Sequence, residues 1–427
     1  MNKSFQKCEL PISFRQIVAM CIVTLFFALG ASCLNQDSDK SGTATADEEV
    51  KTFLSKGAQP ISVADGSWID SHINDQRVVL IGEEVHGIAE HIHLKSELAR
   101  RLITHHGFTH IFLEDDVFKA KYIHNNIHAT SPQPSASVFR FFFWCWNVTE
   151  LHDFFDHLPA LQPLPAVHGL DVQTAAFAIH SLKSNSKKDE QLAAIQSLDE
   201  IFAGGRSTYA KRSPETQIND LAFIEKLTDV FPQTDIEHVQ RHLRRVQAVW
   251  TVADDLDLRM NARDRGMAES VMDVLKSDHN AKVIIFAHNT HAGYSPFYEN
   301  HSQAGIIPLG KHLRDTAGVK TLSIGAVAAT GSILLDPRAR EDNGGPIKHH
   351  RLPKPGTQAE YWFAIPHDRW LLDVNAVTKH DMPNAVAAFF TASPAGYFDN
   401  YGPARPLGNS YDLIVGYREV NPATPPQ

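Results

Sequence analysis

The sequence predicts a three-layer α/β/α protein with a largely parallel central sheet. RVVLIG (77–82) is a short β-branched run that ends at a glycine, and FTHIFLE (108–114) is a second strand-like run. Between them, apolar residues recur at helical spacing: Ile88, Ile92, Leu98, Leu102 and Ile103. Gly107 is placed to end that helix. A strand, a helix and a strand within about 40 residues form a βαβ unit, which implies parallel strands.

The same strand-like pattern recurs further along the chain. It is found in AVHGLD (166–171), KVIIFA (282–287), VKTLSIGAV (319–327) and YDLIVGY (411–417). Residues from about 175 to 276 carry many charges and almost no strand-like run, which predicts a helical insertion. We expect this insertion to cap the site at the end of the sheet; simple helical decoration is the alternative. Residues 336–356 are rich in Pro, Gly and charge, which predicts a surface loop.

Composition and charge narrow the class of protein. Of the 427 residues, 43% are hydrophobic and 21% are charged, a balance typical of ordered globular proteins. The formal net charge is -9 at pH 7. A nucleic-acid-binding protein needs a basic surface to contact phosphates, so nucleic acid is not an expected partner. No feature of the sequence predicts an oligomeric state.

The N-terminus has the pattern of a secretory signal over residues 1–32. A basic start is followed by the apolar run IVAMCIVTLFFALGA (17–31), which is short for a membrane-spanning helix. The small residues before Cys33 resemble a bacterial lipobox, in which the cysteine is lipidated and becomes the first mature residue. We therefore expect export to the bacterial cell envelope and a lipid anchor to a membrane at Cys33. An ordinary signal peptide or an uncleaved anchor is the alternative.

A polar segment separates the signal from the folded part. Residues 33–47 are small and polar, without aromatic side chains, which predicts a flexible tether. A single catalytic domain is then expected over 48–422. Two of the four cysteines lie in the signal and a third is Cys33, so no disulfide framework is expected. Cys145 lies among bulky apolar residues in FFFWCWN and is expected to be an inert buried thiol.

Polar side chains follow several of the predicted strands. Loops beyond the carboxyl ends of parallel strands are free of packing contacts, and ligands bind there. GEEVHG (82–87) brings Glu83, Glu84 and His86 to that edge. Other residues at the same edge are Glu114, Asp171, and His288 and His291 of HNTH. We therefore expect these groups, which lie far apart in the sequence, to form one site.

His86 is the candidate general base. A nearby helix N-terminus lowers the pKa of an imidazole, whereas a neighbouring carboxylate raises it and fixes the tautomer. A neutral, oriented imidazole can take a proton from water near neutral pH. The alternative is a histidine that satisfies backbone groups at a strand-to-helix turn.

A metal site on the same residues is a second interpretation. Imidazole and carboxylate groups are suitable zinc ligands, and His86, His288 and Glu83 could supply them. Neither H-E-x-x-H nor H-x-x-E-H is present, so a divalent metal could bind but none is required. The sequence also lacks a G-x-S-x-G elbow, which disfavours a serine α/β-hydrolase, and no Walker A or dinucleotide-binding glycine motif follows the first strand.

Taken in order, these segments resemble the erythromycin esterase family. The family's opening motif G-E-[AG]-[TS]-H-G, followed by a helix and GF…LE, is similar to GEEVHG (82–87) and to the residues from Gly107 to Glu114. The remaining matches are FFFWCWNVTEL, HGLDVQ, RDRGMAESVMDVL (263–275), AKVIIFAHNTHAG (281–293) and YDLIVGYREVNP. The resemblance spans residues 77 to 422, and the ordered set is more specific than any one motif.

The resemblance implies hydrolysis of an ester or macrolactone, including macrolide inactivation, without a covalent enzyme intermediate. His86 would activate a water molecule and Glu83 would orient His86 or share the site. His288 and Glu114 would complete the catalytic set and stabilise the developing oxyanion. The expected partner is a small-molecule ester or lactone, and no cofactor is required. The substrate-binding residues would be His291, Lys95, Glu84, Trp146, Asp171 and Arg263.

The chain departs from the family pattern at several positions. Glu84 and Val85 stand where the family has a small residue and Thr or Ser. Lys95 replaces an arginine, which keeps the charge but loses the bidentate fork. These changes leave the identity of the substrate open. A protein of another class, an envelope lipoprotein that binds haem or a macrocycle without turnover, is the alternative to an enzyme because the chain has 24 histidines.

Overall fold

The computed structural model describes residues 40–62, 66–186, 188–231, 236–296, 305–316, 318–335, 348–353, 357–379, 382–391 and 407–426. The predicted signal peptide, Cys33 and most of the predicted loop at 336–356 lie outside these residues. Within the described ranges, no helix is both long enough and apolar enough to cross a membrane.

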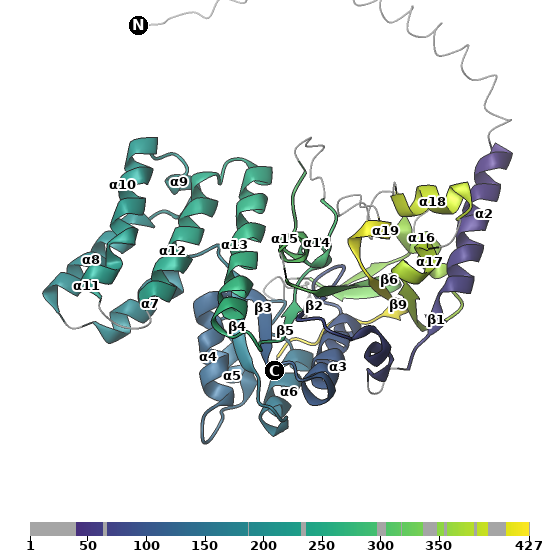
Figure 1. The fold of residues 1–427 in the computed structure, drawn as a ribbon, viewed down its shortest axis with the longest axis horizontal. Coiled ribbons are helices and arrows are strands. Elements are labelled where there is room, and N and C mark those ends of the chain that lie inside the picture. Colours follow the sequence, from purple (N-terminus) through teal and green to yellow (C-terminus); the bar gives the residue numbers. More distant parts are fainter. Residues whose placement is uncertain are drawn as a thin grey trace, which may run out of the picture.

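The central sheet is mostly parallel, as the sequence predicts (Figure 1). Its strands pair in the order β1-β8-β9-β6-β2-β5-β3-β4, and β7 pairs with β6. The parallel strands are β2 (Val78–Ile81), β3 (His110–Asp116), β4 (Ala166–Asp171), β5 (Val283–Phe286), β6 (Thr321–Leu334) and β9 (Leu413–Val420). The antiparallel additions are β1 (Gln59–Pro60), β7 (Lys348–Arg351) and β8 (Arg369–Asp373).

Helices occupy much of the remaining described chain. Before β4 they are α2 (Lys40–Gly57), η1 (Ser67–His72), α3 (Ala89–His106), α4 (Val117–Ile127), α5 (Ser135–Phe139), α6 (Thr149–His157) and η2 (Leu158–Ala160). Between β4 and β5 they are α7 (Ala176–Asn185), α8 (Asp189–Ile201), α9 (Gly205–Tyr209), α10 (Pro214–Glu225), α11 (Leu227–Val230), α12 (Ile236–Thr251) and α13 (Leu256–Ser277). After β5 they are α14 (Asn289–Ala292), α15 (Leu309–Arg314), α16 (Gln358–Phe363), α17 (Val374–Thr378), α18 (Asn384–Thr391) and α19 (Leu407–Ser410).

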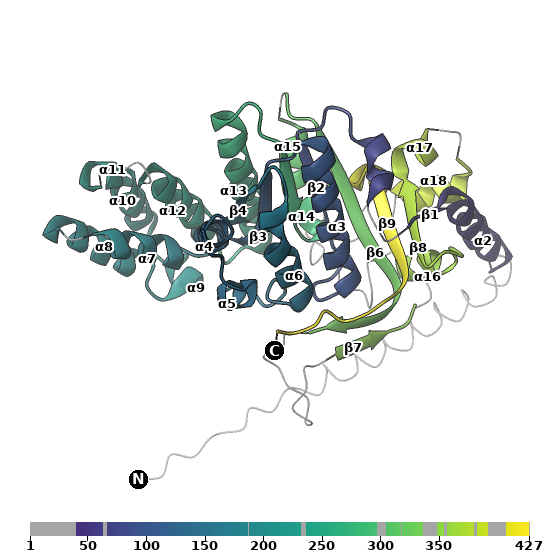
Figure 2. The same cartoon turned by 90° about the horizontal axis from the view of Figure 1, so that it is seen from below.

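β2 is buried on both faces because its four residues are all apolar. Val79 and Ile81 join the core that contains residues of α3 and α6, whereas Val78 and Leu80 pack on the other face with residues of α13 and α15. Side chains alternate along a strand, so one short strand contributes to two apolar layers. In Figure 2, α3 and α6 lie in front of the strands. The predicted three-layer arrangement is therefore confirmed.

α3 ends where the sequence predicts. Gly107 has a φ of 67°, in the left-handed region, and the amide of Phe108 donates to the carbonyl of Leu102. A glycine is favoured at such a helix end because it has no Cβ to clash. The turn leads directly into β3, which lies parallel to β2 with β5 between them. The βαβ unit predicted over 77–114 is confirmed.

β2 lies between β5 and β6, at the point where the order of the strands reverses. The chain first builds β3 and β4 on one side of β2, and after β5 it crosses to the other side to build β6 and β9. The loops at such a reversal diverge and leave a crevice at the carboxyl ends of the strands. Residues that follow β2, β3, β4 and β5 therefore meet at one edge.

The segment after β4 is helical, and α7 to α12 form a layer beside the sheet (Figure 1). Their apolar faces make a core of their own, which includes Leu198, Tyr209 and Leu243. α13 packs against both α12 and β4. Of the helices in this segment, α13 is the one that borders the cavity described below. The cap expected from the sequence is therefore limited to α13.

α2 begins at Lys40, inside the segment 33–47 that the sequence predicts as a tether. Val50 and Leu54 are buried with residues of α16 and α18, and Asp47 accepts a 2.8 Å hydrogen bond from the hydroxyl of Tyr361. The helix thus begins before Glu48, the residue at which the sequence places the start of the catalytic domain. The polar composition conceals this helix because its apolar residues lie in its second half.

Several buried or half-buried histidines are neutral in the folded protein at pH 7. Burial lowers the pKa of His91, His168 and His288 to about 3, and that of His238 and His242 to about 4. In an unfolded chain a histidine titrates near a pH of about 6.5. As the pH is lowered, these histidines therefore take up protons at a higher pH in the unfolded chain than in the folded protein.

We expect the free energy of unfolding to fall as the pH is lowered from 7 to 5. The folded-state pKa values of these histidines are depressed, so protons bind preferentially to the unfolded chain below about pH 6.5. Each such histidine lowers the free energy of unfolding by up to about 1.4 kcal/mol for each pH unit below about 6.5. Asp116 acts in the opposite direction, because burial raises its pKa to about 7. Urea unfolding midpoints at pH 7, 6 and 5 measure the effect, and a constant or rising midpoint would contradict it.

Candidate active site

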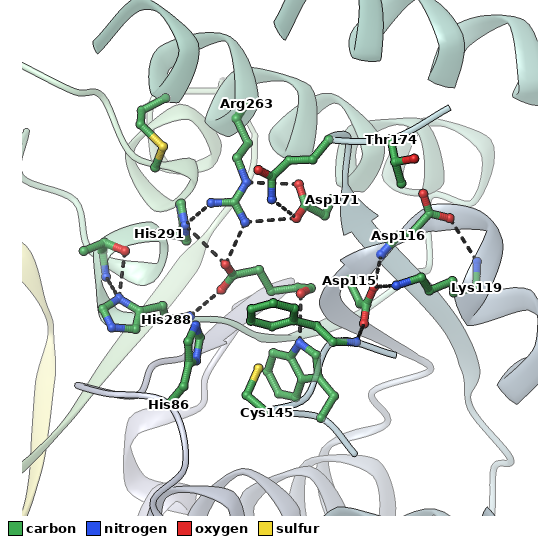
Figure 3. A pocket seen from close by; sticks show the side chains of 16 residues that line it. His86, Asp115, Asp116, Lys119, Cys145, Asp171, Thr174, Arg263, His288 and His291 are labelled. Carbon is green, nitrogen blue, oxygen red and sulfur yellow. Dashed lines mark hydrogen bonds and ion pairs between the residues drawn. The ribbon is translucent and has the colours of Figure 1, made fainter. Parts of the chain in front are cut away.

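A cavity of about 590 Å³ lies at the carboxyl ends of β2, β3, β4 and β5 (Figure 3). Met260 and Arg263 of α13 form part of its wall. The residues singled out from the sequence that line it are His86, Glu114, Trp146, Asp171, Arg263, His288 and His291. The structure therefore brings these side chains together, as the strand order requires.

Glu83 joins the cavity histidine His86 to a buried lysine. Its Oε1 lies 2.5 Å from Nδ1 of His86, and its Oε2 lies 2.8 Å from Nζ of Lys95. Lys95 is fully buried, and its ammonium lies 4.7 Å from the centroid of the Trp146 ring. Burial alone would raise the pKa of Glu83, but the charges of Lys95 and His86 lower it to about 2. The ionised carboxylate fixes Nδ1 of His86 as a donor and leaves Nε2 for the cavity.

The partners of His86, rather than a helix terminus, decide its pKa. Burial disfavours the imidazolium, but the ionised carboxylate of Glu83 at Nδ1 raises the pKa of His86 above its ordinary value. Phe143 and Trp144 each contact the ring edge-on, with centroids 6.2 Å away. The neutral form, which can accept a proton, therefore becomes more abundant as the pH rises above neutrality.

Cys145 is buried, as the sequence predicts, but it lies at the site. It lines the cavity, and its thiol is within hydrogen-bonding reach of His86. Burial raises the pKa of this thiol, although His86 opposes the shift, so the sulfur is protonated at neutral pH. The flanking aromatic residues predict burial only. The contact with His86 has no signal in the local sequence.

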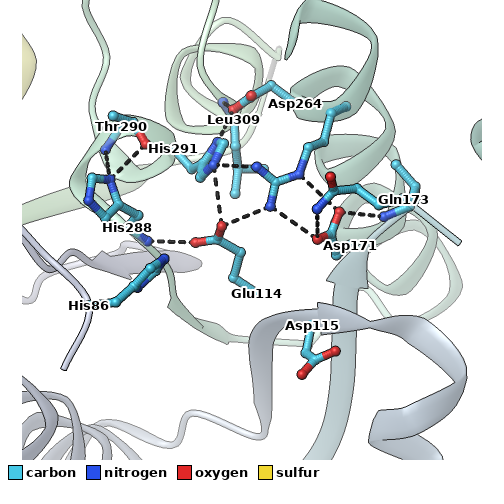
Figure 4. Close-up of polar contacts among 12 residues, drawn as sticks. His86, Glu114, Asp115, Asp171, Gln173, Asp264, His288, Thr290, His291 and Leu309 are labelled. Atoms are coloured by element: carbon cyan, nitrogen blue, oxygen red, sulfur yellow. Dashed lines mark hydrogen bonds and ion pairs between the residues drawn. The ribbon is translucent and has the colours of Figure 1, made fainter. Parts of the chain in front are cut away.

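Glu114 connects three elements of the fold (Figure 4). Its Oε1 accepts from Nη2 of Arg263 at 2.8 Å, and its Oε2 accepts from the backbone amide of His288 at 2.7 Å. Arg263 also forms a bidentate pair with Asp171, with both contacts at 3.0 Å. Burial opposes ionisation, but His291 and Arg263 hold the pKa of Glu114 well below its usual value. The end of β3 is thereby tied to α13 and to the loop after β5.

His288 is placed as a neutral hydrogen-bond donor. It is the N-cap of α14, where its Nδ1 accepts from the amide of Thr290 at 3.2 Å. Burial and the neighbouring His86 lower the pKa of His288 to about 3. A neutral ring whose Nδ1 accepts carries its proton on Nε2. The rings of His86 and His288 are adjacent, with centroids 5.2 Å apart.

His291 contacts carboxylates and a cation. Its Nδ1 lies 2.8 Å from Oδ1 of Asp264, and its Nε2 lies 2.9 Å from Nη1 of Arg263 and 3.3 Å from Oε1 of Glu114. Burial opposes protonation, but Asp264 and Glu114 raise the pKa of His291 to about 9. Asp264 was not singled out from the sequence, although it follows Arg263 directly in RDRGMAE.

Two of the expected substrate contacts lie behind the site. Glu84 and Lys95 are buried and do not line the cavity, so the structure corrects their assignment as substrate-binding residues. Glu84 accepts a 2.7 Å hydrogen bond from the amide of Ala328, in the part of β6 that runs past the end of β2. The carboxylate of Glu84 thus accepts the hydrogen bond that a backbone carbonyl of β2 would accept if β2 extended this far along β6. Lys95 is the counter-ion of the first carboxylate of GEEVHG, Glu83.

Gly82 allows the side chain of Asn289, in the motif AHNTH, to pack against the backbone of the motif GEEVHG. A Cβ on this residue would lie 2.0 Å from Oδ1 of Asn289. That oxygen accepts from the amide of Ala326 at 3.2 Å, and Nδ2 of Asn289 donates to the carbonyl of Ala326 at 2.8 Å. The glycine of GEEVHG is therefore needed so that the asparagine of AHNTH can reach β6.

The residues considered as metal ligands are engaged in hydrogen bonds. Nδ1 of His86 contacts Glu83, and Nδ1 of His288 accepts from Thr290. In the part of the chain that the structure describes, no group of three or more His, Cys, Asp or Glu side chains is placed to hold a metal ion.

The fold and site define a largely parallel α/β protein with a buried carboxylate and histidine site at its strand ends. Solved structures share the fold. A succinoglycan biosynthesis protein has a TM-score of 0.71 and 16% identity, over 90% of this chain and 99% of that chain. A Bacillus cereus protein has a TM-score of 0.69 and 15% identity, over 89% and 99%. A mutant of the erythromycin esterase EreC in its open conformation has a TM-score of 0.59 and 15% identity, over 81% and 91%.

Sequence comparison gives the family. The erythromycin esterase family model matches residues 103–420, and the chain belongs to that family. Erythromycin esterase type II from Escherichia coli is 22% identical over 328 residues, which are 66% of this chain and 76% of that protein. Membership supports an esterase-like hydrolase that acts on ester bonds. The family match begins after Glu83 and His86, so the roles of these two residues rest on the GEEVHG motif and on geometry.

Replacing Arg263 with methionine should destabilise the fold. The change leaves Glu114 and Asp171 buried without the cation that they share, and breaking a buried pair in this way costs about 3–5 kcal/mol. Chemical denaturation measures the difference. The matched control is Arg244→Met, because Arg244 pairs with Glu225 at a half-exposed position, where the loss is below about 1 kcal/mol. Equal losses in the two variants would contradict the account.

Proposed function

We propose that the protein hydrolyses a carboxylic ester or lactone through a water molecule that His86 activates. The observation that carries the proposal is the 2.5 Å contact between Nδ1 of His86 and Glu83, beside a cavity that His288 also lines. A water molecule held at Nε2 of His86 can transfer a proton to that nitrogen as its oxygen attacks the carbonyl carbon. The tetrahedral intermediate then collapses with cleavage of the ester C–O bond, and the departing alkoxide takes the proton from Nε2, which leaves a carboxylic acid and an alcohol. Glu83 keeps the ring oriented and stabilises the imidazolium that forms.

His288 supports the proposal because it offers a donor beside the base. Its neutral ring carries the proton on Nε2, the nitrogen that Thr290 does not engage. A donor directed at a developing oxyanion contributes about 10²–10³-fold to kcat. Glu114 accepts a hydrogen bond from the backbone amide of His288 and also pairs with Arg263. The position of the donor ring is therefore fixed by the network of Glu114 and Arg263.

The cavity suits an ester with an apolar body. Its volume of about 590 Å³ lies in the range of small-molecule sites. Phe143, Trp146 and Met260 contribute apolar surface beside the polar groups. Since relatives are named erythromycin esterases, macrolactones are the first substrates to test, with macrolide inactivation as the corresponding activity. The proposal invokes no cofactor.

His86→Asn should lower kcat for ester or lactone hydrolysis by about 10²–10⁴-fold, because the general base is lost. A mass-spectrometric screen of macrolides, smaller lactones and simple esters measures turnover by the wild type beside the variant. His93→Asn is the matched control, because His93 lies on the exposed side of α3 and should keep wild-type turnover. Equally slow turnover of every substrate by the wild type and by His86→Asn would refute the proposal.

We also propose that the protein is exported to the bacterial cell envelope and held at a membrane by lipid on Cys33. The support comes from the sequence: a basic start, the apolar run at 17–31, and small residues directly before Cys33.

Cys33→Ser should move the protein from the membrane fraction to the soluble fraction of cells, because the acyl chains on the cysteine provide the attachment. Immunoblots of the two fractions after ultracentrifugation measure the change. Cys145→Ser is the control and should stay with the membranes, because Cys145 is buried inside the folded domain. Membrane attachment of both variants would rule out lipidation at Cys33 as the anchor.

A further inference from the structure

A second cavity, which we call the arginine cavity, lies on the helical segment outside the candidate active site. Its volume is about 390 Å³, and residues of α10, α12 and α13 form its wall. These helices lie next to one another beside the sheet (Figure 1). The charged side chains that line it are four arginines and one carboxylate: Arg241, Arg244, Arg245, Arg265 and Glu269. Since the chain has a formal net charge of -9, this concentration of positive charge does not follow from composition.

The spacing of the arginines brings them to one cavity from two helices. Arg241, Arg244 and Arg245 stand at i, i+3 and i+4 on α12, so they share one face of that helix. Arg265 follows Arg263 by two residues on α13, which is about 200° around the helix axis. Arg263 therefore lines the active-site cavity, whereas Arg265 lines the arginine cavity.

Asp273 orients two of the guanidinium groups. Its Oδ2 accepts from Nε of Arg241 at 3.2 Å and from Nη2 of Arg245 at 2.8 Å. Arg245 also donates to Glu269 and to the hydroxyl of Ser270, both at 3.1 Å. The side chain of Arg245 is only 10% exposed. Its guanidinium is therefore held in place before a ligand binds, which reduces the entropy lost on binding.

The remaining ion pairs of these arginines are loose. Arg244 lies 3.9 Å from Glu225, and both side chains are half-exposed. Glu237 lies 3.5 Å from Arg241, and its side chain is 72% exposed. Arg265 is exposed, and it has no hydrogen bond or ion pair with the rest of the described chain. Exposed pairs of this kind contribute at most about 1 kcal/mol, so these arginines can turn to a ligand at little cost.

The charge count around the cavity leaves an excess of two positive charges. The four arginines carry four positive charges, and the two carboxylates that contact them within 3.2 Å carry two negative charges. Asp220 of α10 is already paired with Arg212 at 2.8 Å. His238 and His242 of α12 are neutral at pH 7, because burial lowers their pKa to about 4. The excess therefore lies on the arginines themselves.

We propose that the arginine cavity binds the phosphate group of a phosphorylated small molecule. A phosphate monoester carries a charge of about -1.5 to -2 at pH 7, which matches the excess, whereas a carboxylate would leave one positive charge. Guanidinium groups bind phosphate oxygens through paired N–H donors. The volume of about 390 Å³ leaves room for an organic body beside the phosphate. This binding does not depend on the proposed hydrolysis.

Isothermal titration calorimetry of the full chain with glucose 6-phosphate, inorganic phosphate and glucose tests the proposal. Both phosphates should bind at one saturable site, and glucose should not bind. The double variant Arg244→Gln/Arg265→Gln should lower the affinity for both phosphates at least about 10-fold, because charged hydrogen bonds are lost. Both side chains are exposed, so the variant should fold, which circular dichroism checks. Arg206→Gln is the matched control, because Arg206 is exposed on α9 and does not line the cavity.

The active-site cavity contains cations too, and one further variant separates the two sites. Lys119 lines the active-site cavity, so Lys119→Met should bind both phosphates as tightly as the wild type. Phosphate binding that is lost in Lys119→Met and kept in Arg244→Gln/Arg265→Gln would overturn the proposal. Absence of saturable binding of either phosphate, or an equal affinity in the wild type and the double variant, would overturn it as well.

A lipid headgroup offers the same phosphate chemistry, and a soluble lipid distinguishes the two sources. Short-chain phosphatidic acid, titrated below its critical micelle concentration, should bind no more tightly than glucose 6-phosphate. If it binds at least ten times more tightly, and if this binding is lost in Arg244→Gln/Arg265→Gln, the ligand is a lipid phosphate and the assignment to a small molecule is wrong.

Discussion

The site depends on the burial of one ionised carboxylate, Glu114. One of its oxygens accepts from Arg263 and the other accepts from the backbone amide of His288, so a single side chain at the end of β3 connects α13 to the loop after β5. A carboxylate can be buried in ionised form only if cations and donors surround it. Arg263 meets that requirement and is shared with Asp171 at the end of β4. The polar wall of the cavity is therefore one electrostatic unit built from four distant segments.

Two histidines beside this unit divide the chemistry between them. Glu83 raises the pKa of His86, whereas burial lowers that of His288 to about 3, although the two rings are 5.2 Å apart. Neighbouring groups whose pKa values are pushed in opposite directions are suited to separate proton-accepting and hydrogen-bond-donating roles. The close fit of Gly82 against Asn289 fixes the relative position of the loops that carry these histidines. The fold thus places the rings of His86 and His288 side by side, and the groups around each ring make their pKa values differ.

Much of the fold and of the site could be predicted from the sequence. β2 and β3 are apolar runs, and the glycine that ends α3 has the left-handed conformation that its position requires. The convergence of His86, Glu114 and His288 followed from placing each of them after a parallel strand. Such patterns report burial and strand direction, which are local properties.

The remaining features depend on contacts between distant segments. The role of Glu84 comes from β6 extending beyond β2, and no residue near Glu84 encodes that length. The contact of Cys145 with His86 and that of Asp264 with His291 each join loops or helices that the sequence separates widely. The same holds for the insertion, whose helical content was predictable whereas its position beside the sheet was not. In each case the local sequence does not identify the distant residue that the side chain contacts.

A structure of the protein bound to a phosphonate analogue of an ester or lactone substrate tests the central claim, that His86 and His288 flank the reacting carbonyl. Such an analogue places charged oxygens where the attacking water and the oxyanion lie in the transition state. The account predicts one phosphonyl oxygen within hydrogen-bonding distance of Nε2 of His86 and another within that distance of Nε2 of His288. A phosphonyl group bound away from both rings, for example against Lys119 in another part of the same cavity, would contradict it.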